Sequence, residues 1–131
     1  MNDFNLDTIR LTVHLLSVCI WVGGQIIMAG LVPVLREISP EAPKKVAARF
    51  GQVAWPAFGV AVITGVWSIV DLEGTQANDY SVTLGVKLLA VTLSGMAAFV
   101  HQRTPSPAMR AVTGALGLVA ALAGMVLGVM L

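Results

Sequence analysis

The sequence predicts an all-α integral membrane protein, a four-helix bundle with both termini on the outer side of the membrane. Hydrophobic residues make up 56% of the 131 residues, charged residues make up 11%, and the mean hydropathy is +0.83. A water-soluble domain of this size has too little interior to hide so much apolar surface. The apolar residues also fall in four runs of about 20, the length that an α-helix needs to cross a bilayer. We therefore expect a single membrane domain over 1–131.

The four expected spans are 11–35, 53–70, 82–100 and 111–131. The first follows Asn5 and Asp7, whose side chains commonly cap helix N-termini. Its apolar run is too long for the core of a signal peptide, so we expect it to be retained as a helix. Breaks between the spans are predicted at the proline-containing or polar stretches 39–43, 73–80 and 104–107.

The second span has a basic approach and an internal proline. The stretch 43–51 carries Lys44, Lys45 and Arg49 among apolar residues. It is expected to form an amphipathic first turn at the inner membrane surface. Pro56 lies inside the span and should kink the helix, because proline lacks a backbone N–H and crowds the preceding turn.

Loop charges predict the orientation of the chain, since Lys and Arg in short loops favour the cytoplasmic side. The first and third connections are basic, whereas the second is acidic. Both termini should therefore face outward, in a multi-pass protein of the cell (inner/cytoplasmic) membrane. The net charge is only +1 and the basic residues are divided between two loops, so the expected partner is the lipid bilayer and not nucleic acid. The charged residues are Arg36, Lys44, Lys45 and Arg49 in the first connection, Asp71, Glu73 and Asp79 in the second, and Arg103 and Arg110 in the third.

Polar residues recur at helical spacing on three of the spans. Residues three or four positions apart share one face of a helix. Because lipid offers no hydrogen-bond partner, these faces should point into the bundle. The face of the first span consists of Arg10, His14, Ser17, Trp21, Gln25 and Met28, with Gly24 beside it. The face of the second span consists of Gln52, Trp55, Thr64, Trp67 and Ser68. The face of the third span consists of Tyr80, Thr83, Lys87, Ser94 and His101.

The fourth span carries small residues where the others carry polar ones. Its ridge consists of Gly117, Ala121, Gly124 and Gly128. Such a ridge lets a neighbouring helix approach closely. We expect it to pack either within the bundle or between protomers, in a homodimer or a larger membrane complex.

Three basic residues inside or at the edge of apolar runs are the candidate functional residues, because ionisable groups in a membrane are costly and usually functional. With both termini outside, His14 and Lys87 should lie at matching depth near the outer face. His101 follows Lys87 by 14 residues, which is about 21 Å along a helix. His14 and His101 should therefore not share a metal within one chain.

Each candidate also has a purely structural interpretation. Lys87 can extend to the outer surface or pair with Asp71 or Glu73. His14 can be a neutral imidazole that is hydrogen-bonded to a backbone carbonyl or to Ser17. The functional interpretation of His14 is axial ligation or proton transfer, since imidazole ligates metals and titrates near neutral pH.

The segment 11–24, LTVHLLSVCIWVGG, resembles the first-helix signature of the CopD-like (copper resistance protein D) membrane family. In that signature a His is followed seven residues later by Trp and then by a Gly pair. The segments 49–51 with 63–66, and 84–89, resemble the family's next two helices. The resemblance extends over roughly 11–101 and leaves the fourth span generic.

That family is similar to the HemJ-type membrane protoporphyrinogen oxidases, in which a first-helix His and a Lys are associated with a b-type haem. The resemblance therefore implies haem b, with His14 as a ligand of the haem iron and Lys87 as a second ligand or a propionate partner. The chain has Val-Pro-Val-Leu-Arg at 32–36 in place of the oxidase's Pro-Arg-Leu and Tyr-His continuation. We accordingly expect a redox or haem/porphyrin-related role without assigning oxidase activity.

The remaining residues expected around a haem are Arg10 for a propionate, Ser17, Gly24 and Thr64 for space, and Trp21 and Trp67 as walls. Two other classes of function stay open. A copper-handling transporter would use the polar faces as a path, although Cys19 is the single cysteine and the methionines lack paired spacing. A structural or assembly subunit of a larger membrane complex would need only the small size and the glycine ridge.

Overall fold

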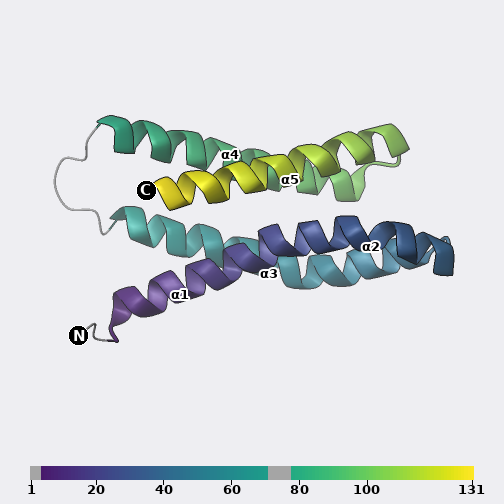
Figure 1. Ribbon diagram of the computed structural model, residues 1–131, viewed down its shortest axis with the longest axis horizontal. Coiled ribbons are helices and arrows are strands. Elements are labelled where there is room, and N and C mark those ends of the chain that lie inside the picture. Colours follow the sequence, from purple (N-terminus) through teal and green to yellow (C-terminus); the bar gives the residue numbers. More distant parts are fainter. Residues whose placement is uncertain (1–3, 71–77) are drawn as a thin grey trace. The chain divides into compact units, whose positions relative to one another are not determined.

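The computed structural model describes residues 4–70 and 78–131, and this part of the chain is all-α, with no strand. It contains four helical segments long and apolar enough to cross a membrane, which indicates a multi-pass membrane protein and confirms the all-α prediction. The chain divides into two compact units, Met1–Glu73 and Gly74–Leu131. Each unit contains two of the four segments (Figure 1).

The first unit is a helical hairpin whose outgoing arm is one continuous helix. This arm consists of α1 (Leu6–Val18), η1 (Cys19–Gly23) and α2 (Gly24–Ile38), and the returning arm is α3 (Ala42–Val70). Asn5 caps α1, because its side chain accepts a hydrogen bond from the Thr8 N–H at 3.0 Å while the Thr8 hydroxyl lies 3.4 Å from the Asn5 N–H. Of the two expected capping residues, Asn5 is therefore the one used.

Both arms are longer than the apolar runs predicted. The first extends over 33 residues, or about 50 Å, against a hydrocarbon core of about 30 Å. The basic stretch 43–51 forms the first turns of α3, as expected, and Pro43 is tolerated there because the first turn of a helix needs no hydrogen bond from its N–H. Lys44 and Lys45 are exposed there, so their charged ends reach out from a helix that still presents an apolar side.

The first arm contains a π-helical turn, which hydrophobic periodicity does not predict. It spans Cys19–Gly23 and contains Trp21 and Val22, which are 7% and 5% exposed. A π-turn adds one residue to the helical repeat, so consecutive side chains can both turn toward a neighbouring helix. The turn thus brings Trp21 and Val22 together into the packing of the hairpin.

The second unit is a hairpin of α4 (Asn78–Arg103) and α5 (Pro107–Met130). Ser106 caps α5 by accepting the Met109 N–H at 3.3 Å, and Pro107 occupies the first turn. The two helices approach closely along small residues: the Ser94 hydroxyl donates to the Gly117 carbonyl oxygen at 3.1 Å. A β-carbon at Gly124 would lie 3.3 Å from Val91 Cγ2. The small-residue ridge of α5 therefore packs against α4, within the chain.

Candidate functional site

His14 bridges the two arms of the first hairpin. Its Nδ1 atom lies 2.8 Å from the Thr64 hydroxyl oxygen and 3.0 Å from the Ala61 carbonyl oxygen, both on α3. The Thr64 hydroxyl lies 2.8 Å from the Val60 carbonyl oxygen of its own helix, to which it can donate. A carbonyl oxygen can only accept, so the arrangement favours the tautomer that carries the proton on Nδ1. The structural interpretation of His14, an imidazole bonded to a backbone carbonyl, is thus realised.

A histidine that ligates a metal makes hydrogen bonds of the same kind as those of His14. Such a histidine usually donates one ring N–H to a carbonyl or carboxylate, which fixes the ring and raises the basicity of the other nitrogen. With the proton on Nδ1, Nε2 is the nitrogen of His14 that has the lone pair required for ligation. Ser17 takes no part in this arrangement, because its hydroxyl donates to the Val13 carbonyl oxygen at 2.8 Å.

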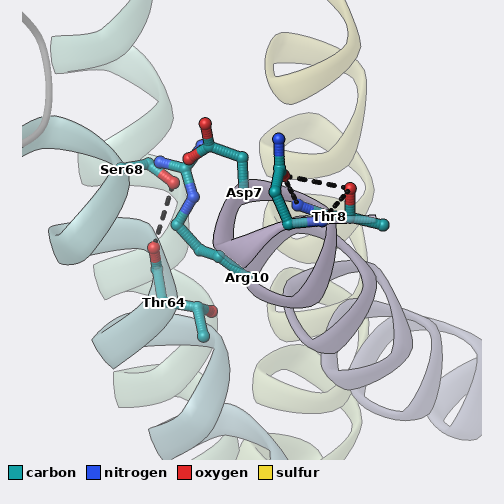
Figure 2. A network of polar contacts seen from close by, with 6 residues as sticks. Asp7, Thr8, Arg10, Thr64 and Ser68 are labelled. Atoms are coloured by element: carbon teal, nitrogen blue, oxygen red, sulfur yellow. Dashed lines mark hydrogen bonds and ion pairs between the residues drawn. The ribbon is translucent and has the colours of Figure 1, made fainter. Parts of the chain in front are cut away.

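Arg10 lies one turn before His14 and is held at the edge of the same interface. Its Nη2 is 3.2 Å from Asp7 Oδ1, and the Arg10 side chain is 18% exposed whereas that of Asp7 is 72% exposed. Figure 2 shows the Arg10 side chain pointing from α1 toward α3, on the side where Thr64 and Ser68 lie. Its buried Nε atom has no hydrogen-bond partner among the described residues. Arg10 therefore has one donor, Nε, that its pair with Asp7 leaves unused.

An aromatic cluster lies further along the same hairpin, where η1 packs against α3. The Trp21 ring lies 4.5 Å from the Phe58 ring and 5.2 Å from the Trp55 ring, measured between centroids. Trp21 is therefore an internal packing residue of the α1–α3 hairpin. Trp67, the other expected wall, is 39% exposed on α3.

The space beside Gly24 is filled by the chain itself. A β-carbon at Gly24 would overlap the ring of Phe50 on α3. The glycine thus permits a close approach of α2 and α3 at this level. The contacts of Phe50 and Phe58 were not anticipated in the sequence, because a phenylalanine in an apolar run carries no signal of what it packs against.

Lys87 belongs to the second unit, so its expected pairing with His14 remains a prediction. It is half-buried on α4, and its Nζ would lie 3.2 Å from a β-carbon placed at Gly128 of α5. Its alternative partners, Asp71 and Glu73, lie outside the described residues.

His101 lies near the C-terminal end of α4 and contacts α5 close to the turn that connects the two helices. Its Nδ1 is 2.7 Å from the Arg110 carbonyl oxygen. A β-carbon at Gly114 would lie 3.1 Å from its ring. Lys87, Ser94 and His101 therefore all contact α5 from α4, which confirms that they share one helix face.

The donor set of the described residues is too sparse for a metal ion held by protein alone. No group of three or more His, Cys, Asp or Glu side chains in 4–70 and 78–131 could hold one. Cys19 is exposed on the first arm. A haem brings four nitrogen ligands of its own and needs only one or two from the protein, so a single histidine would suffice as the protein's ligand.

No protein-family model, curated protein or solved structure matches the chain. The case for function therefore rests on the chemistry of the residues around His14.

Proposed function

We propose that this chain is a four-span membrane protein that binds one b-type haem through His14 and has a redox or haem/porphyrin-related role. The observation that carries the proposal is the pair of contacts from His14 Nδ1 to Thr64 and Ala61. They match the orientation of an axial ligand, and they lie in a helix whose segment 11–24 resembles the CopD-like signature. Such a haem, when bound, would supply one-electron chemistry at its iron.

The protein's part in this role is to ligate, orient and pair charges. His14 would be held in one tautomer by α3, and Arg10 would hold a propionate, since a guanidinium has several donors that match a carboxylate. Lys87 is proposed as a second ligand or propionate partner on the resemblance of 84–89. Trp21 and Thr64 would act indirectly, by packing the hairpin and by fixing His14.

The proposed orientation has both termini outside the cell membrane. Its support is the distribution of basic residues. The ends of α2 and α3 next to their connection carry four of them, and the ends of α4 and α5 next to theirs carry two more: Arg36, Lys44, Lys45, Arg49, Arg103 and Arg110. Single cysteines introduced at Asn5 and at Arg103, in separate variants, would test this orientation in intact cells. A thiol reagent that does not cross the membrane should label Asn5→Cys and should not label Arg103→Cys.

The test of His14 uses the second histidine as a matched control. We expect His14→Ala to abolish the b-type spectrum of the purified protein or to convert it to that of loosely bound haem. We expect His101→Ala to leave the spectrum intact, because His101 follows Lys87, the proposed second ligand, by 14 residues, or about 21 Å along α4, and cannot share an iron with it. An unchanged spectrum in His14→Ala would remove the ligand assignment, and a colourless wild-type protein would favour copper handling or an assembly role.

A further inference from the structure

An open groove runs along the first hairpin between α2 and α3, toward their connection. It has a volume of about 480 Å³ and is lined by Met28, Lys45, Val46, Arg49, Phe50 and Val53. Lys45 and Arg49 are one helical turn apart on α3 and both are exposed. The lining surface is almost entirely apolar, so Lys45 and Arg49 line the groove with the aliphatic parts of their side chains, and their charged ends lie at its edge.

The two cations are not neutralised by the chain. Arg49 donates from Nη1 to the Gln52 side-chain oxygen at 3.0 Å, which leaves its charge uncompensated. Neither Lys45 nor Arg49 is ion-paired with a carboxylate in the part of the chain that the structure describes. Lys44 adds a third positive charge next to the groove but does not line it. Lys45 and Arg49 therefore offer two positive charges at the edge of the groove.

Positively charged residues come first along α3, and apolar residues follow them. Lys45 lies in the first turns of α3, and Val53 follows it by eight residues, or about 12 Å along the axis. Arg49 and Phe50 lie between them. A ligand that fills this groove needs an anionic group at one end and a hydrocarbon chain at the other.

We propose that this groove binds one anionic phospholipid, with its phosphate at Lys45 and Arg49 and the start of an acyl chain along Phe50 and Val53. Basic pockets between membrane helices bind anionic head groups in this way. A zwitterionic lipid carries a cationic group that the same residues would repel. A soluble phosphate would leave the apolar floor uncovered, and the proposal is independent of haem binding.

The experiment measures the binding of the first molecule of phosphatidylglycerol and of phosphatidylcholine to the full chain by native mass spectrometry from detergent. We expect phosphatidylglycerol to bind more tightly to the wild type. Lys45→Gln should weaken its binding about 5-fold, and the double variant with Arg49→Gln about 30-fold, while phosphatidylcholine binding stays unchanged.

Lys44→Gln is the matched control, because it removes the same charge one residue away and outside the groove. We expect it to leave the preference for phosphatidylglycerol intact. Equal losses in Lys44→Gln and Lys45→Gln would overturn the proposal in favour of diffuse attraction to the membrane surface. Val53→Trp, at an exposed position of the groove floor, should weaken phosphatidylglycerol binding with no change in charge. Unimpaired binding in Val53→Trp would overturn the acyl-chain part of the proposal, and competition by glycerol phosphate equal to that of the whole lipid would do the same.

Discussion

Replacing Thr64 by Val tests the link between α1 and α3 on which the site depends. The substitution keeps the branched shape of a side chain that is 6% exposed and removes the hydroxyl that lies 2.8 Å from His14 Nδ1. The Ala61 carbonyl oxygen at 3.0 Å remains as an acceptor for His14, so the imidazole keeps one partner. Hydrogen bonds between membrane helices contribute about 0.6 kcal/mol on average and about 1.7 kcal/mol at most. We expect Thr64→Val to lower the free energy of unfolding by about 0.6–1 kcal/mol, within that range.

The assay is a double-mutant cycle with His14→Ala on the haem-free protein. Unfolding by sodium dodecyl sulfate in mixed micelles, followed by circular dichroism, gives the free energy for the wild type, both single variants and the double variant. A direct bond predicts a coupling energy of about 0.6–1 kcal/mol, because the cycle removes all effects that each residue has alone. A coupling energy indistinguishable from zero would refute the bond between His14 and Thr64. Ser17→Ala serves as a control, since the Ser17 hydroxyl bonds within its own helix and should show no coupling to His14.

Three further substitutions, two of them with a matched control, test the packing of the hairpins and the cap of α1 by their unfolding free energies. Gly24→Ala should destabilise the protein by about 1–3 kcal/mol, because the Phe50 ring must move. Gly23→Ala is its control and should be neutral or stabilising, because nothing lies within 4 Å of the added carbon. Equal effects of the two substitutions would contradict the close approach of α2 and α3. Gly124→Leu should loosen the second hairpin and Gly85→Leu should not, and a neutral Gly124→Leu would contradict the packing of α5 on α4. Asn5→Ala should cost about 0.5–2 kcal/mol through loss of the cap, and a neutral result would contradict the capping box.

The number and place of the helices could be predicted because they depend on local properties. Apolar run length identifies each span, and the proline-containing breaks near Pro40 and Pro105 separate the arms of each hairpin. The start of α3 was predicted from a different property, the basic stretch 43–51 that was expected to form the first turn of this helix. Lys44, Lys45 and Arg49 interrupt the apolar run, but long basic side chains are compatible with a helix whose first turns extend past the hydrocarbon core.

The candidate site was predictable only in part. The spacing of Arg10, His14 and Ser17 on one helix face is a sequence property, and the structure places His14 against α3 as that spacing requires. The partner oxygen of Ala61 is a backbone atom, so no residue type at that position announces it. Helical periodicity reveals neither the π-turn that contains Trp21 nor the packing of the Trp21 ring against Trp55 and Phe58.

The glycines show a similar division. The sequence predicted that the ridge containing Gly117 and Gly124 would permit close helix packing, and left open whether its partner lay inside the chain. The hydrogen bond from Ser94 to Gly117 identifies α4 as the partner. Gly24 was expected to leave space for a ligand, yet its neighbour is the ring of Phe50, because a missing side chain gives space to whichever group lies closest.

The most direct test of the central claim is a reduced-minus-oxidised visible spectrum of the detergent-purified protein, combined with a pyridine haemochrome assay of haem per chain. We expect a b-type difference spectrum at a near-integral ratio of one haem per chain, with His14 as an iron ligand. A well-folded, colourless protein that takes up no added haem would contradict it and would leave His14 as a structural link between α1 and α3.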